Sequence, residues 1–240
     1  MHAYLLVFAN CSPYNIRQQN SEGVVIRITV KGLAKFMRKG PAAQRVVLRD
    51  FKFPREPEAR AQTVYYAEAR SGIRDYHASE NDASTLVRSV DILRIKADRA
   101  VGQKRIRLEH NIRAIERYLH HFSTKRFQIL RSPNLTYSHG EVVVSATPDL
   151  FVKEGNDEKL IRLDLGADPA DEDMIRIVLQ VTYEAAVSCG MRIRPSHVVY
   201  LDISRGTQHV GAKARTRLSR DIEAACENIE AMWGGIKKLQ

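Results

Sequence analysis

The sequence has few of the residues that would indicate a disulfide-rich, zinc-binding or iron–sulfur protein. It contains 3 cysteines among 240 residues, Cys11, Cys189 and Cys226, and none of them forms a CxxC pair. Three widely separated thiols exclude a four-cysteine cluster and indicate a reducing compartment, so we expect a cytoplasmic protein. The histidines are scattered too, and the adjacent His120 and His121 point to different sides of a helix.

Long apolar runs are also missing. No apolar stretch approaches the roughly 18 residues that a membrane-spanning helix needs. Residues 1–12 contain a short apolar run without a basic start or a cleavage site, so we predict no secretion signal and expect residues 1–25 to form a tail or one extra strand. Repeats, glycine-rich phosphate loops and nucleophile motifs are absent, which leaves a small-molecule enzyme without support.

What the chain does have is an uneven surplus of positive charge. The composition, 44% hydrophobic and 28% charged, is that of an ordinary globular protein. The net charge of +10 comes entirely from residues 1–132, because residues 133–240 carry slightly more Asp and Glu than Lys and Arg. A polyanion such as DNA or RNA is the natural partner of this distribution, since neutralised phosphates release counterions. The alternative is a basic surface without a binding role.

The acidic residues of most interest lie in the stretch 140–200. A β-branched run at 142–144 resumes at 149–152, so Asp149 falls where one strand enters the next. Residues 154–157 have the composition of a turn.

A second strand is expected at 159–165, followed by a helix and a further strand at 197–201. Alternation along the second strand puts Leu160, Arg162 and Asp164 on one face of the sheet. Two adjacent strands that each carry an aspartate near the same end bring two carboxylates together. Such a pair, with water and substrate phosphate, suits Mg²⁺ or Mn²⁺.

These residues resemble the PD-(D/E)XK nuclease superfamily, most closely its RecB-like branch. The resemblance rests on Pro148-Asp149, on Asp164-Leu165-Gly166 after fourteen intervening residues, and on a following helix with Gln180 and Tyr183, and it covers roughly residues 109–233. It implies an α/β fold with a mixed central sheet flanked by helices. It also implies divalent-metal-dependent hydrolysis of DNA, with Asp149, Asp164 and the Leu165 carbonyl as metal ligands.

The chain departs from the family at the lysine that orients or activates the attacking water, which is Gly166 here. The spacing from Gln180 to Tyr183 is also one residue shorter than in the family. Arg162 lies roughly 6.6 Å from Asp164 along the strand and reaches a phosphate, but a guanidinium is no base. Lys153 is roughly 13 Å from Asp149. A bound metal lowers the pKa of water by itself. Two functions therefore remain: an active nuclease, or an inactive nuclease-like nucleic-acid-binding or scaffold protein.

The resemblance implies further site residues on two helices. A helix expected at 103–122 carries Glu109, His110 and Glu116 as candidates for a further metal ligand. The spacing from Glu109 to Arg113 is also that of an ordinary helical ion pair. On the helix expected at 174–189, Gln180 together with Arg162 is assigned to phosphate. That helix is expected to bury Ile177, Val178, Val181 and Ala185 and to leave Arg176, Gln180, Tyr183 and Glu184 on its surface.

The residues before this core form a predicted basic helical region, 26–102, so that the core spans 103–240. Two short helices separated by Gly40-Pro41 indicate phosphate contact through Lys35, Arg38 and Lys39, with Arg176 and Tyr183 of the core as further nucleic-acid contacts. A helix-turn-helix is an alternative interpretation.

Two more helices are expected within the basic region. One spans 59–77, and its tyrosines Tyr65, Tyr66 and Tyr76 either stack on bases or belong to the core. The next helix begins after Asp82 or Ser84 as its cap. It is expected to bury four residues, Leu86, Val90, Leu93 and Ala97.

Overall fold

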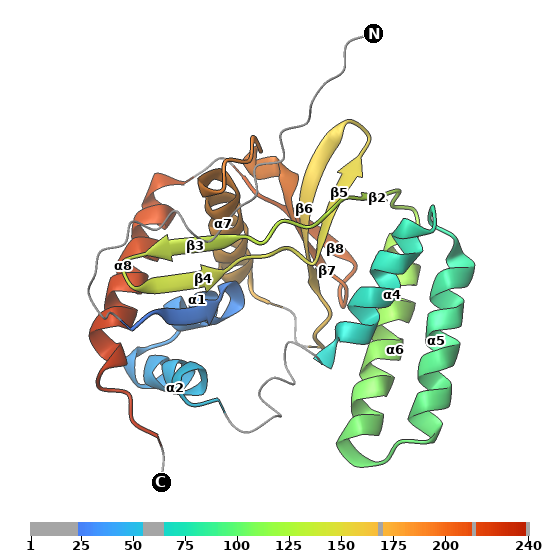
Figure 1. The fold of residues 1–240 in the computed structure, drawn as a ribbon, viewed down its shortest axis with the longest axis horizontal. Helices are drawn as coiled ribbons and strands as arrows, with labels where there is room; N and C mark the ends of the chain where they lie inside the picture. The colour runs from blue at the N-terminus through green and yellow to red at the C-terminus, as the bar shows by residue number, and fades with distance from the viewer. Residues whose placement is uncertain (1–23, 55–64, 168–169, 213–214, 239–240) are drawn as a thin grey trace.

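The computed structural model describes residues 24–54, 65–167, 170–212 and 215–238, and it shows the predicted α/β fold. These residues form seven helices and two mixed sheets (Figure 1). The helices are α1 (Val30–Met37), α2 (Pro41–Lys52), α4 (Ala67–Ala78), α5 (Ala83–Asp98), α6 (Gly102–Phe122), α7 (Glu172–Ser188) and α8 (Thr216–Trp233), with a short 3₁₀ turn, η1 (Pro195–His197). The strands are β1 (Ile26–Thr29), β2 (Gln128–Ile129), β3 (Thr136–His139), β4 (Val142–Ser145), β5 (Leu150–Glu154), β6 (Asp157–Asp164), β7 (Val198–Asp202) and β8 (Thr207–Val210).

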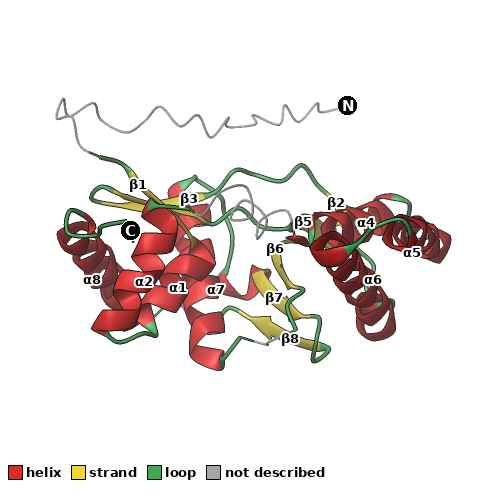
Figure 2. Cartoon of the chain, turned by 90° about the horizontal axis from the view of Figure 1, so that it is seen from below, coloured by secondary structure: helices red, strands yellow, loops and turns green. Residues whose placement is uncertain are grey.

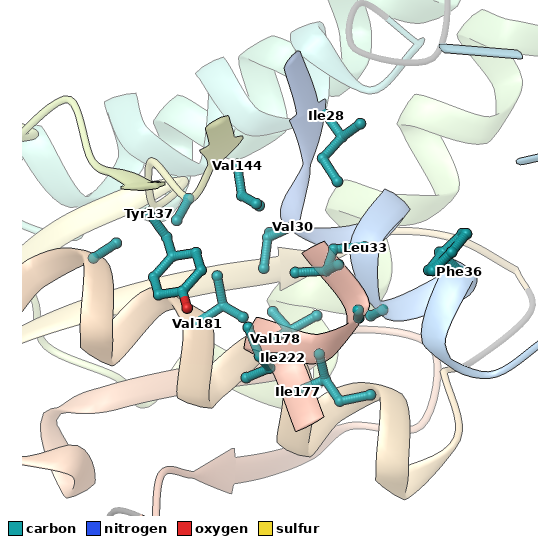
Figure 3. Packing of buried hydrophobic residues seen from close by; sticks show 14 of the residues in the cluster. Ile28, Val30, Leu33, Phe36, Tyr137, Val144, Ile177, Val178, Val181 and Ile222 are labelled. Atoms are coloured by element: carbon teal, nitrogen blue, oxygen red, sulfur yellow. The ribbon is translucent and has the colours of Figure 1, made fainter. Parts of the chain in front are cut away.

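The smaller sheet has three strands in the order β1-β4-β3, with β1 parallel to β4 and β3 antiparallel to it. Its buried face is made by alternate residues such as Ile26, Ile28, Val142 and Val144. This face packs with α1, α7 and α8 in one hydrophobic cluster. Figure 3 shows side chains of β1, α1, β4 and α7 gathered in that cluster.

The larger sheet has five strands in the order β2-β5-β6-β7-β8. Strands β6 and β7 are parallel and are joined through α7, whereas the other neighbours are antiparallel. Leu160, Val198 and Tyr200 face the cluster of α1, α7 and α8, while Ile161 and Val199 face a second cluster built with α4, α5 and α6. The sheet is therefore covered on both faces, which Figures 1 and 2 show as helices on either side of β5–β8.

Helix boundaries follow from capping chemistry in the sequence. Thr29 accepts a hydrogen bond from an amide of the first turn of α1, and Asp82, one of the two predicted caps, does the same for α5. Pro41 begins α2, where a missing N–H costs nothing. The predicted break at Gly40-Pro41 and the predicted buried stripe of α5 are both confirmed.

Some strands were not predicted, and some predicted segments lie outside the described residues. β1 and β8 were not predicted, and the run at 142–152 divides into β4 and β5, which belong to different sheets. Residues 1–23 and 59–64, expected as a tail and as the start of a helix, lie outside the described residues. The predicted basic helical region, 26–102, contributes to both hydrophobic clusters. Among the described helices, none combines the length and apolar character needed to cross a bilayer.

The central strand β7 gives a test of this packing. Leu201 is fully buried in the second cluster, so Leu201→Ala is expected to lower the free energy of unfolding by about 2–5 kcal/mol. Val210 on the edge strand β8 is 49% exposed, and Val210→Ala is expected to change it by less than about 0.5 kcal/mol. Urea unfolding of both variants checks the difference, and equal losses would contradict a core centred on β7.

Candidate functional site

Both predicted aspartates lie at the carboxyl end of β6. Asp149 directly precedes β5 and extends its pairing with β6, because its amide donates to Ile161 and its Oδ2 accepts from the amide of Leu163 at 2.8 Å. The Asp149 carboxylate thus lies beside the amide of Leu163, the residue before Asp164. Leu163 and Asp164 are separated by one strand rise, about 3.3 Å along the backbone. The alternation that places Asp164 on the face of Leu160 and Arg162 is confirmed by the packing.

Asp164 is buried, and its carboxylate is held by side chains from two elements, α1 and β7. Lys31 of α1 donates from Nζ to Oδ1 at 2.7 Å, and the Tyr200 hydroxyl of β7 donates to Oδ2 at 2.5 Å. Burial by itself raises the pKa of Asp164. Attraction to Lys31 and hydrogen bonds from Lys31, Tyr200 and the Gly166 backbone outweigh it, so the pKa lies below the ordinary value.

Asp149 is held by arginines. Arg70 of α4 places Nε 2.8 Å from Oδ1, and Arg162 of β6 places Nε 3.8 Å from Oδ2. One helical turn after Arg70, Arg74 donates to the backbone oxygen of Asp149 at 3.1 Å. Arg162 also donates to the carbonyl of Thr147, and it therefore fixes the chain that leads into Asp149.

Asp149, Asp164, Lys31, Arg70 and Arg162 together form what we call the β6-end cluster. It contains two carboxylates and three protein cations, and each of the four carboxylate oxygens already has a donor or cation beside it. Within the described ranges, no three His, Cys, Asp or Glu side chains converge on a point where they would hold a metal ion. Mg²⁺ needs carboxylate oxygens at about 2.0–2.1 Å, which Lys31 and Arg70 obstruct. The cluster as it stands does not fit the predicted Mg²⁺ or Mn²⁺.

A third acid, Asp202, lies next to the cluster and was not predicted. It is in register with Asp164 on the parallel strand β7 and is 1% exposed. Its Oδ1 accepts from Ser204 and from the Arg205 amide, which shapes the turn into β8. Its Oδ2 has no hydrogen bond among the described residues and lies 3.9 Å from Arg205 Nε.

The other predicted metal ligands lie in different surroundings. Glu109 pairs with Arg105, one turn earlier on α6, at 2.8 Å. Helical ion pairs of this kind were the alternative to a metal role for Glu109. The Leu165 side chain is buried in the second hydrophobic cluster directly after Asp164. Neither observation assigns these residues a metal.

Three predicted residues of α7 line one small pocket of about 250 Å³, Arg176, Gln180 and Tyr183. Gln180 was expected on the helix surface, and this was wrong, because it is only 8% exposed. Its amide donates to Glu184 at 2.7 Å and to Ser219 of α8 at 3.3 Å, so the start of α8 covers it. Arg176 pairs with Glu172 and Asp173 of its own helix.

The predicted phosphate contacts on α1 differ in their availability. Lys35 and Lys39 are exposed and form no ion pair with any residue that the structure describes, whereas Arg38 pairs with Asp171 and Asp173. Lys31 and Lys35 are four residues apart and lie on one side of α1, and Lys39 follows two residues after the helix ends at Met37. This spacing was visible in the sequence, but the contact between Lys31 and Asp164 was not.

Among the tyrosines before α6, the core alternative is confirmed for Tyr76, and base stacking stays a prediction for Tyr65 and Tyr66. Tyr76 is buried in the second hydrophobic cluster. Tyr65 and Tyr66 are half-buried at the start of α4, with ring centroids 5.0 Å apart in an edge-on arrangement. Burial raises the pKa of the Tyr66 hydroxyl, and the charges of Tyr65 and Asp164 add to this shift.

A larger cleft of about 630 Å³ lies elsewhere, at the other end of β5 near Lys153, Arg126 and His77. It does not include any residue of the β6-end cluster. Size alone therefore does not identify the functional site.

Comparison of the sequence with known protein families and with curated proteins gives no match.

The pKa of Asp164 tests the role of Lys31. In Lys31→Met the attraction is removed while burial remains, so the pKa of Asp164 is expected to rise above its wild-type value. Because the pKa of Asp164 is lowered in the folded protein, its ionisation stabilises the fold at pH values above the unfolded pKa of about 3.9. This contribution is lost as the pH falls through the folded pKa. NMR titration of the Asp164 carboxyl carbon measures the shift. Lys35→Met is the matched control, and an unchanged pKa in Lys31→Met would contradict the assignment.

Proposed function

We propose that this chain binds nucleic acid, with DNA as the expected partner, through a nuclease-like core whose acidic site is neutralised by its own cations. The observation that carries the proposal is the convergence of cations on the carboxyl end of β6. Lys31 of α1 pairs with Asp164, and Arg70 of α4 pairs with Asp149. The next cations on the same helices, Lys35 and Arg74, are exposed.

The connectivity around these aspartates supports the nuclease resemblance. Asp149 precedes a strand that is antiparallel to β6, and Asp164 ends β6. Helix α7 then crosses to β7, which is parallel to β6. This is the order of strands, helix and strand on which the resemblance was stated. It supports the family without depending on the missing lysine.

Electrostatics supports binding over catalysis. The β6-end cluster has one more cation than carboxylates, and its Lys31 and Arg70 side chains are 34% and 29% exposed. A phosphate approaching this end of the sheet meets protein cations before it meets the aspartates. Lysines along one side of a helix bind a phosphate backbone without reading bases. A cytoplasmic location agrees with the scattered cysteines, none of which forms a CxxC pair.

Salt dependence tests Lys35 of α1 and Lys39, which follows the helix. For a fluorescently labelled oligonucleotide, single-stranded and duplex, the logarithm of the binding constant is expected to fall linearly with the logarithm of salt concentration. In the double variant Lys35→Ala/Lys39→Ala the slope is expected to decrease by about 2, about 1 for each lost phosphate contact. Fluorescence anisotropy over a range of salt concentrations measures it.

The matched control removes the same charge from another surface. Lys96 and Lys104 are exposed on α5 and α6, and Lys96→Ala/Lys104→Ala is expected to leave the slope unchanged. Equal effects of the two double variants would mean that net charge alone drives binding. Absence of binding at low salt would refute the proposal.

Hydrolysis is the second candidate, and one observation favours it: an ammonium, that of Lys31, lies against Asp164 although position 166 is glycine. We nevertheless expect no cleavage of plasmid or single-stranded DNA with Mg²⁺ or Mn²⁺, because Arg70 and Lys31 occupy the carboxylates. Gly166→Lys is expected to stay inactive for the same reason. Gel electrophoresis of the DNA checks both. Cleavage that disappears in Asp149→Asn and Asp164→Asn would establish a nuclease instead.

A further inference from the structure

Exposed apolar side chains gather on the hairpin formed by α5 and α6. The described residues include ten large hydrophobic side chains that are exposed, and five of them lie within residues 87–106. These five are Val87, Ile92, Ile95, Val101 and Ile106, with exposures of 52%, 47%, 53%, 85% and 42%. Single exposed apolar residues are ordinary, but a concentration of them on one hairpin indicates an interaction surface.

Helix α5 carries two stripes with the same spacing on different sides. Its buried stripe, Leu86, Val90, Leu93 and Ala97, packs against α4 and α6 at intervals of four, three and four residues. A second set at the same intervals, Arg88, Ile92, Ile95 and Arg99, is exposed. At about 100° per residue these four lie within about 60° of one another around the helix, which is the geometry of a helix–helix seam. We call this set the outer α5 stripe.

The outer α5 stripe lies at the periphery of the molecule. Figures 1 and 2 show α5 on the outside of the helical layer, with α4 and α6 toward the sheet. The β6-end cluster draws its helical residues from α1 and α4. The stripe is therefore separate from the proposed nucleic-acid site, and an inference about it does not depend on that function.

Charge decides what fits this stripe. Two copies of α5 packed in parallel would set Arg88 against Arg88, and packed antiparallel they would set Arg88 against Arg99. Like charges disfavour both arrangements, so a second copy of this chain is a poor partner. A nucleic-acid backbone would match the arginines, but it offers no apolar surface to Ile92 and Ile95. A helix with apolar residues between acidic ones matches all four positions.

We propose that the outer α5 stripe docks an amphipathic helix of another protein, one that presents two neighbouring leucines or isoleucines between flanking Glu or Asp residues. The apolar pair covers Ile92 and Ile95, and the flanking carboxylates pair with Arg88 and Arg99. The wider hairpin favours the same partner. Within residues 87–106, Arg and Lys outnumber Asp, and Asp91 already pairs with Arg94.

The test uses the full chain and a synthetic helical peptide with Glu, Leu, Leu and Glu at intervals of four, three and four. A second peptide has Arg in place of both Glu residues. Fluorescence anisotropy is expected to show binding of the acidic peptide and at least about tenfold weaker binding of the basic one. Ile92→Ser/Ile95→Ser is expected to weaken acidic-peptide binding by at least about tenfold. Val46→Ser/Val187→Ser, which removes two apolar side chains of similar exposure elsewhere, is expected to have no effect.

Three outcomes would overturn the proposal. The first is no binding of the acidic peptide up to about 1 mM. The second is dimerisation of the wild-type chain in sedimentation velocity that Ile92→Ser/Ile95→Ser abolishes, since the surface would then belong to a second copy. The third is an equal loss of oligonucleotide binding in that variant, which would make the stripe part of the nucleic-acid site. The thermal midpoint of both double variants is expected to match wild type, because the altered side chains are exposed.

Discussion

Two ion pairs at the end of β6 join the two helical layers that the sheet separates. Lys31 reaches Asp164 from α1, which packs in one hydrophobic cluster, and Arg70 reaches Asp149 from α4, which packs in the other. The carboxylates are only 8% and 12% exposed, whereas the cations are about one-third exposed. Solvent screens such pairs, so each adds modest stability. Removing one cation is nevertheless costly, because a buried carboxylate would be left without its partner.

The same two pairs are the reason why we propose binding and not hydrolysis. An acidic site that awaits a divalent cation has surplus negative charge and free carboxylate oxygens. Here the surplus is positive, and Lys31, Tyr200, Arg70 and the Leu163 amide occupy those oxygens. Tyr200 reinforces this state. Burial and Asp164 raise its pKa far above the usual range, so its hydroxyl keeps the proton that it donates. The next cations on α1 and α4, Lys35 and Arg74, remain exposed, and our proposal assigns phosphate to this side.

Sequence patterns predicted the parts of this arrangement that depend on nearby residues. Alternation placed Asp164 on the correct face of β6, and cap and proline signals placed the helix ends. The contact between Lys31 and Asp164 spans 133 positions of the chain, and no local pattern encodes it. β1 was missed because its four residues gain stability by pairing with β4, far along the chain. Gln180 was misplaced because α8, not the periodicity of α7, decides its burial. The role of Glu109 stayed ambiguous because a glutamate on a helix can bind a metal or pair with an arginine four residues away.

Glycine at 166 is consistent with Lys31 as the partner of Asp164. The backbone of Gly166 already donates to the Asp164 carboxylate, and Lys31 of α1 pairs with the same carboxylate. A lysine side chain at 166 would bring a second ammonium to one buried carboxylate. Two like charges would then compete for a single counterion, and one of them would have to remain in solvent. Glycine at position 166 and the distant lysine at position 31 thus belong to one electrostatic arrangement. Position 166 is best interpreted together with position 31.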